Sequence, residues 1–142
     1  MPTMASATQP VTKQQYETLA NFRYQVRRFL RYSERVTRTQ GVTPLQYQLM
    51  LQVQGYPGRD WATVSELAER LQAKHHGVGA LLTRCAKRGL LVRNASISDR
   101  RSVEVRLTSK GKKTLQRIAQ LHLQELVTLQ GQLTVGGRRA PS

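Results

Sequence analysis

Residues 99–111, with the sequence DRRSVEVRLTSKG, constrain the fold of this chain more than any other stretch. Apolar and charged side chains alternate through residues 103–107, and this period of two predicts a half-buried strand. A second short apolar run lies just upstream, at residues 90–93. Two such strands joined by a charged tip, with helices on both sides, predict a β-wing. Its tip carries Arg100 and Arg101 outward, where they suit a DNA groove or a row of phosphates.

Two helical segments precede this wing near the N-terminus. Apolar side chains repeat at helical spacing over residues 12–39, and we interpret the arginines on a second stripe as a solvated face. Thr43 and Gln46 match a capping box, so the next helix should begin with Pro44 in its first turn. We expect the buried face of that helix to contain Leu45, Leu49 and Val53.

A helix-turn-helix pattern follows. A second capping box, at Thr63 and Glu66, predicts a short helix over residues 64–71. After a tight turn, a longer basic helix is predicted over residues 74–88, with Gly89 just beyond its end. A short helix, a tight turn and a longer basic helix are typical of DNA-binding helix-turn-helix motifs. We expect the longer helix to bury Val78, Leu81, Leu82 and Cys85.

These patterns predict a mainly helical α+β fold, a winged helix-turn-helix core flanked by long N- and C-terminal dimerisation helices. The apolar stripe of the last helix is wider than one small domain covers, and neither long helix has an obvious partner within its own subunit, which favours a closed two-fold dimer. We expect its contacts to include Leu19, Phe22, Leu126 and Leu129. The predicted parts are a disordered N-terminus, an N-terminal dimerisation helix, a DNA-binding domain, a C-terminal dimerisation helix and a flexible tail, over residues 1–11, 12–40, 41–108, 109–133 and 134–142.

The charge of the chain indicates its class of partner. Its 142 residues contain 23 Lys and Arg against 8 Asp and Glu, a formal net charge of +15. A protein this basic usually meets a polyanion, so nucleic acid is the first expectation. We expect no membrane partner, because no run approaches the roughly 18 apolar residues of a membrane helix. A single cysteine and a polar N-terminus without a signal-peptide pattern favour the cytoplasm.

The chain offers little for catalysis or for a metal. We find no nucleophile–base pairing, glycine-rich phosphate loop or carboxylate pair, so we expect no enzyme and no cofactor. His75 and His76 point about 100° apart on a helix, and Cys85 lies roughly 15 Å along its axis, so these groups do not converge on one ion. We interpret Cys85 as an inert buried thiol rather than a redox sensor, and His122 as a satisfied core or interface histidine.

Four short motifs carry a family resemblance through their order and spacing. They are TVSELA, GLLVR, DRR and LTSKG, at residues 63–68, 89–93, 99–101 and 107–111. Over about residues 43–111 the chain resembles the MarR (multiple antibiotic resistance regulator) family of winged-helix transcription factors. The flanking helices fit by position and pattern. The resemblance implies a homodimer whose two recognition helices enter successive major grooves of a pseudo-palindromic operator in double-stranded DNA.

The resemblance also implies roles for individual residues of the wing. It points to Arg101 as the wing arginine that reaches the minor groove, with Arg100 beside it. It places Arg93 and Asp99 as an ion pair that stiffens the wing. A candidate effector pocket, between the dimerisation helices and the winged helix, consists of Tyr24, Arg28, Tyr47 and Trp61.

The recognition helix departs from the pattern of the family at its start. Its first residues are Lys74, His75, His76 and Gly77, where Ser and Thr are common, and a second glycine follows at position 79. Each glycine costs about 1 kcal/mol relative to alanine inside a helix. The glycines either permit close approach to DNA or leave the helix soft until it binds. We expect His75 and His76 to contact bases, and Arg84, further along, to contact phosphate.

Two functional hypotheses follow. The first is a homodimeric, sequence-specific transcriptional regulator, a repressor whose DNA affinity responds to a small ligand. The second is a winged-helix interaction protein that docks other proteins or coats nucleic acid by charge alone. A comparison of binding to operator and to scrambled DNA at fixed salt separates them.

Overall fold

The structure is a computed structural model that describes residues 9–96, 101–132, 134–135 and 138–139. Its described residues fall into two compact units. The winged-helix unit is Ser33–His122, and the terminal unit combines the residues before Ser33 with those after His122. Two long helices, α1 (Lys13–Thr39) and α5 (Ser109–Gln132), each contribute residues to both units.

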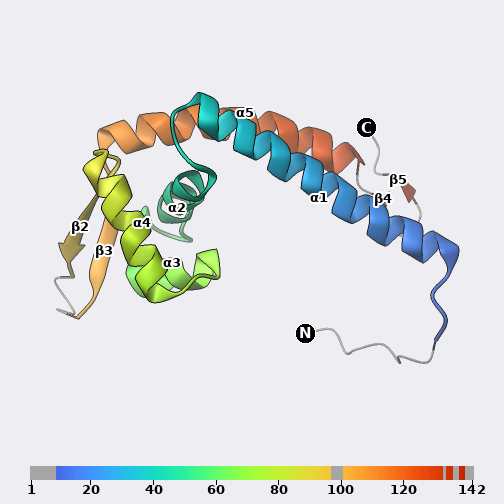
Figure 1. The fold of residues 1–142 in the computed structure, drawn as a ribbon, viewed down its shortest axis with the longest axis horizontal. Coiled ribbons are helices and arrows are strands. Elements are labelled where there is room, and N and C mark those ends of the chain that lie inside the picture. The colour runs from blue at the N-terminus through green and yellow to red at the C-terminus, as the bar shows by residue number, and fades with distance from the viewer. Residues whose placement is uncertain (1–8, 97–100, 133, 136–137, 140–142) are drawn as a thin grey trace. The chain divides into compact units, whose positions relative to one another are not determined.

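The winged-helix unit has the predicted order of helices and wing strands, with one further strand before α3 (Figure 1). After α1 come α2 (Pro44–Gln54), β1 (Trp61–Thr63), α3 (Val64–Leu71), α4 (His75–Lys87), β2 (Leu91–Ala95) and β3 (Val103–Leu107), and then α5. The strands form one antiparallel sheet in the order β1-β3-β2, and the hairpin of β2 and β3 is the wing. The predicted α+β winged-helix fold is therefore confirmed.

Two capping boxes start the helices as predicted. The Thr43 hydroxyl accepts the Gln46 amide N–H at 3.1 Å, and the Gln46 side chain accepts the Thr43 N–H at 3.0 Å. Thr63 and Glu66 make the same reciprocal pair at 3.2 and 2.9 Å. Each pair satisfies two backbone donors that a helix start leaves open, which stabilises the start locally. Gly89 has φ +71°, the left-handed conformation that suits the end of α4.

The core of this unit confirms one predicted helix face and corrects another. On α4, Val78, Leu81, Leu82 and Cys85 are all buried. On α2, Leu49 and Val53 are fully buried but Leu45 is 57% exposed, so the prediction for Leu45 is wrong. Consecutive residues are about 100° apart around a helix, and this places Leu45 roughly 100° from the centre of the buried face. That face instead includes Gln46 and Met50.

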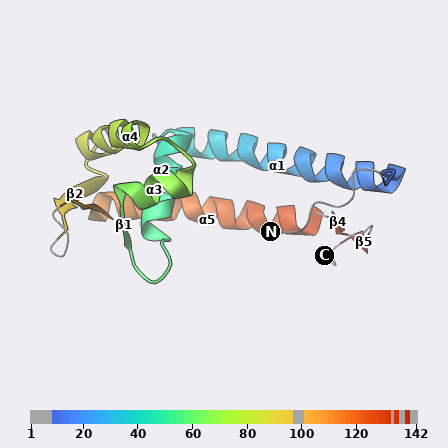
Figure 2. The same cartoon turned by 90° about the horizontal axis from the view of Figure 1, so that it is seen from below.

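Only the two wing strands were predicted from the sequence, and the sheet has a further strand, β1, at its edge. It has only three residues, and its ladder places Ala62 opposite Val105 of β3. Figure 2 shows the loop that joins α2 to β1 projecting beyond α2 before the chain enters the sheet. A segment this short becomes a strand because a longer strand is available to pair with it.

The terminal unit contains α1 up to Tyr32, α5 from Leu123, and a two-stranded antiparallel ladder of β4 (Thr134–Val135) and β5 (Arg138–Arg139). This ladder lies within the stretch predicted to be a flexible tail. The arginine stripe of α1 is exposed, as predicted for a solvated face, at Arg23, Arg27, Arg31, Arg35 and Arg38. Within the described ranges, no helix combines the length and apolarity that a membrane span requires.

Candidate nucleic-acid interface

The start of α4 presents the predicted contact residues to solvent. Lys74 is the N-cap residue and makes no side-chain cap hydrogen bond. His75, His76 and Gly77 follow in the first turn, and all four residues are exposed. The opposite face of the same helix is buried in the core. The helix is therefore held along one face, while its polar and basic groups remain available to a partner.

The outward face of α4 also contains residues that the sequence analysis did not assign. Starting from His76, a spacing of four, seven and eleven residues leads to Ala80, Thr83 and Lys87, opposite the buried face. Ala80 and Lys87 are exposed and Thr83 is half-buried, while Arg84 is exposed at the flank. The helical spacing of these residues from His76 is the signal by which the sequence could have identified them.

The wing lies against the same helix. The Arg93 guanidinium donates to the Thr83 hydroxyl at 3.2 Å, which links β2 directly to α4. Arg101 is exposed just before β3, and the Ser96 N–H donates to the Ser102 carbonyl at 2.9 Å at the base of the tip. The predicted partner of Arg93, Asp99, lies outside the described residues, as does Arg100.

Positive charge is concentrated on these elements. Ten basic side chains lie between residues 84 and 113, against the two acids Asp99 and Glu104. One of the ten is partly neutralised, because Arg106 forms ion pairs with Asp60 at 3.3 Å and with Glu104 at 4.0 Å. The remaining excess suits contact with phosphates, whose neutralisation supplies most of the sequence-independent affinity for DNA.

One stacked arginine, Arg59, holds the loop in front of β1. The Arg59 guanidinium lies 4.2 Å from the ring centre of Tyr56 and 3.9 Å from that of Trp61, and it forms an ion pair with Glu66. Burial raises the pKa of the Glu66 carboxyl, but hydrogen bonds from Thr63, Tyr56 and Arg59 outweigh this and lower the pKa to about 2. Glu66 thus joins a helix cap to the loop through one carboxylate.

Each of the four residues of the predicted effector pocket makes a ring-stacking or cation–π contact with a neighbouring side chain. The Arg28 guanidinium lies 5.7 Å from the Tyr24 ring centre, within the terminal unit. In the winged-helix unit, Tyr47 is 5% exposed and stacks on His122 with 4.5 Å between ring centres. Burial raises the pKa of the Tyr47 hydroxyl. Trp61 is covered by Arg59, so the common pocket stays a prediction.

Two buried groups have the inert environments expected of them. His122 donates from Nδ1 to the Ile118 carbonyl at 2.9 Å, and its Nε2 hydrogen-bonds the Ser33 hydroxyl at 2.8 Å, which confirms a satisfied histidine. Cys85 is fully buried. Its burial raises the pKa of the thiol to about 11, although Arg88 lowers it slightly. Among the described residues, no group of three His, Cys, Asp or Glu side chains is placed to hold a metal ion.

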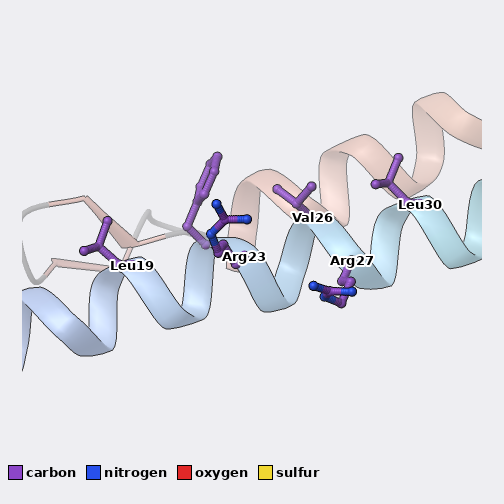
Figure 3. A pocket seen from close by; sticks show the side chains of 6 residues that line it. Leu19, Arg23, Val26, Arg27 and Leu30 are labelled. Carbon is purple, nitrogen blue, oxygen red and sulfur yellow. The ribbon is translucent and has the colours of Figure 1, made fainter.

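The apolar stripes predicted for dimer contacts are open to solvent in the single chain. Leu19 is 62% exposed, Phe22 54% and Leu126 40%, while Leu129 is half-buried. Figure 3 shows Leu19, Val26 and Leu30 projecting from the same side of α1. They belong to a shallow groove of about 530 Å³ that is lined by Leu19, Phe22, Arg23, Val26, Arg27 and Leu30. The dimer contacts themselves stay a prediction.

Comparison with known proteins agrees with this geometry. Residues 40–102 match the model of the MarR family. A curated relative from Thauera aromatica, named "Putative transcriptional regulatory protein for hcr operon", is 30% identical over 98 residues, which are 69% of this chain. The chain spans 57% of the length of that relative.

Solved structures of this family share the fold. AbsC, a MarR family transcriptional regulator from Streptomyces coelicolor, is 20% identical with a TM-score of 0.73, over 91% of this chain and 86% of AbsC. A mutant of S. aureus MepR bound to an oligodeoxyribonucleotide is 22% identical with a TM-score of 0.64, over 88% of this chain and 86% of MepR. Residues 40–102, which include the helix-turn-helix, thus match the MarR family, and the described residues share the fold of solved structures of that family.

Proposed function

We propose that the chain is a transcriptional regulator that binds a specific pseudo-palindromic sequence in double-stranded DNA as a homodimer. The observation that carries this proposal is the exposed start of α4, with His75 and His76 on a helix whose other face is fixed in the core. Groups at the start of a recognition helix reach base edges, where sequence is distinguished. The neighbouring wing supplies cations for the phosphates.

Dimer formation is supported by the open apolar side chains of the terminal unit. Leaving Leu19, Phe22 and Leu126 in water costs free energy that a second copy would recover by covering them. Replacement of Leu126 and Leu129 by Glu should give a monomer by light scattering and weaken DNA binding strongly, since half the contacts are lost. A double variant that remains a dimer would contradict the assignment of these residues to the interface.

In this proposal the protein represses transcription while bound, and a small ligand that prefers the DNA-free form releases it. A ligand shifts such an equilibrium only by as much as it binds one form more tightly than the other. Measurement of operator affinity with and without candidate ligands tests this part. The identity of the ligand follows from that screen.

The decisive experiment compares His76→Ala with Arg84→Ala. The operator is first obtained by sequencing genomic DNA that the purified protein enriches. Each variant is then titrated with operator and with scrambled DNA at several salt concentrations. We expect His76→Ala to weaken operator binding more than scrambled binding, because it removes a base contact. We expect Arg84→Ala to weaken both equally and to reduce the slope of log affinity against log salt by about 1.8 for a dimer.

The result also separates the competing function. A wild-type protein that binds operator and scrambled DNA equally would be one that coats nucleic acid by charge. If Arg84→Ala removes the preference and His76→Ala does not, the base-reading surface lies further along α4 than proposed.

A further inference from the structure

The end of α4 is closed by the beginning of α5. Helices leave their last carbonyl groups without partners inside the helix. Here the Arg88 carbonyl accepts from the Lys110 Nζ at 2.8 Å, and the Gly89 carbonyl accepts from the Thr108 hydroxyl at 2.5 Å. The Leu90 carbonyl accepts from the Thr108 N–H at 3.1 Å. The carbonyl of Arg88, the C-cap residue of α4, and the two carbonyls that follow it are thus satisfied by one short segment, residues 108–110.

The two backbones meet without a gap at this junction. A Cβ added to Gly111 would lie 2.0 Å from the Leu90 carbonyl oxygen, so only glycine fits. On the other side, the Arg88 guanidinium donates to the Gln46 side chain at 3.0 Å, and Gln46 belongs to the cap of α2. Residue 88 is therefore held at both ends, through its carbonyl by α5 and through its side chain by α2.

The opposite end of α4 lacks comparable restraints. Lys74 makes no side-chain cap, and a Cβ added to Gly77 or Gly79 would meet nothing within 4 Å. The buried face holds α4 against the core, and the hydrogen bonds to residue 88 add a restraint on its angle at the C-terminal end. His76 lies about 18 Å from residue 88 along the axis, so a tilt of 5° there moves it by roughly 1.6 Å. Such a displacement exceeds the few tenths of an ångström that a hydrogen bond to a base tolerates.

We infer that Lys110 is a positioning residue for DNA recognition, which acts through the Arg88 carbonyl to hold α4 at the angle that its first turn needs. This role rests on the proposed sequence-specific binding and deepens it. Its ammonium group is at the negative end of the α4 dipole, where a cation is stabilised. A lysine in so basic a region would otherwise be expected to contact phosphate directly, and the two roles predict different measurements.

The test uses the full chain with Lys110→Met, which keeps most of the side-chain length but removes the donor and the charge. Lys112→Met is the matched control. Lys112 is an exposed residue two positions further along α5, and its replacement changes the net charge by the same amount. Lys110→Arg restores both charge and donor. Operator and scrambled DNA are titrated at several salt concentrations, and melting temperatures establish that each variant is folded.

We expect Lys110→Met to lower operator affinity about tenfold more than Lys112→Met does, with equal affinity of the two variants for scrambled DNA and equal salt slopes. Lys110→Arg should recover most of the loss. Equal weakening on both DNAs with a salt slope reduced by about 1.8 would make Lys110 a phosphate contact and overturn the inference. Operator binding at the level of the control would overturn it as well.

Amide hydrogen exchange gives a readout that needs no DNA. Exchange of the amides over residues 86–90 should be faster in Lys110→Met than in wild type or Lys112→Met, because the end of α4 opens more often. Unchanged exchange would refute the restraint of α4 by Lys110 even if DNA binding fell. If wild type showed no preference for its operator but exchange changed as expected, the proposed function would be wrong, whereas the restraint of α4 by Lys110 would be supported.

Discussion

Two glycines of α4 allow a prediction about stability that is worked from the structure. Gly77 and Gly79 are in helical conformation without a positive φ, and a Cβ at either position would meet nothing within 4 Å. Alanine therefore fits without strain and restrains the unfolded chain. An interior helical position gains about 1 kcal/mol from this exchange. Gly77 is in the first turn, so we expect about half as much there. The double variant should be more stable by about 1.5 kcal/mol.

A third glycine supplies the opposite control. Gly111→Ala would bring a methyl group into the Leu90 carbonyl oxygen, and overpacking of this kind costs about 1–3 kcal/mol. For a chain of this size 1 kcal/mol corresponds to about 4 °C in melting temperature. Thermal unfolding followed by circular dichroism should show a rise of about 6 °C for the double alanine variant and a fall for Gly111→Ala. A lower melting temperature for the Gly77 and Gly79 variant would refute the argument that their surroundings are open.

The same double variant also distinguishes the two explanations of these glycines. If they permit close approach to DNA, the more stable protein binds its operator more weakly, because the methyl groups keep the helix away. If they only leave the helix soft, alanine prepays the ordering cost and operator binding becomes equal or tighter. Operator affinity of the double variant, measured beside its melting temperature, therefore assigns their role.

Three further predictions follow from single residues. Because the pKa of the Glu66 carboxyl is lowered to about 2, its stabilisation is present above about pH 4.5 and lost as the pH falls toward 2. Glu66→Gln should cost about 1–2 kcal/mol in urea unfolding at pH 7, less than the roughly 3 kcal/mol limit of the shift since the side chain is 28% exposed. The cost should be much smaller near pH 2, where the carboxyl is largely protonated. With a pKa of about 11 the Cys85 thiol is about 0.1% ionised at pH 8, so an aromatic disulfide reagent should modify the folded protein at least 100-fold more slowly than the urea-unfolded chain. In the wing, Arg101→Ala should weaken operator binding more than tenfold and Lys112→Ala much less, and equal losses would mean that the wing contributes only diffuse charge.

Local chemistry predicted much of this fold. The capping boxes at Thr43 and Thr63 fixed the starts of α2 and α3, because each involves residues only three positions apart. The alternation over residues 103–107 predicted β3, and helical spacing predicted the buried face of α4. Spacing alone misplaced Leu45, because it indicates which residues share a face and not how far that face extends.

The candidate DNA-binding site likewise has one part that the sequence predicted and one part that only the tertiary structure decided. Exposure of His75 and His76 follows from their place at the start of an amphipathic helix, which the sequence contains. The contact of Arg93 with Thr83 joins a strand to a helix, and it adds to the pair with Asp99 that the resemblance implies and that stays a prediction. That contact depends on how the wing is laid against α4, which no local pattern records.

Helix starts, strand periodicity, net charge and the order of the motifs were thus determined by the sequence itself, because each depends on neighbours within a few residues. The strand identity of residues 61–63, the fit of Gly111 against Leu90 and the hold on residue 88 were decided only by the tertiary structure. The bonds to residue 88 join it to Gln46 and Lys110, 42 and 22 positions away along the chain. Such pairings form only after the segments between them have folded, so their partners cannot be recognised from either segment alone.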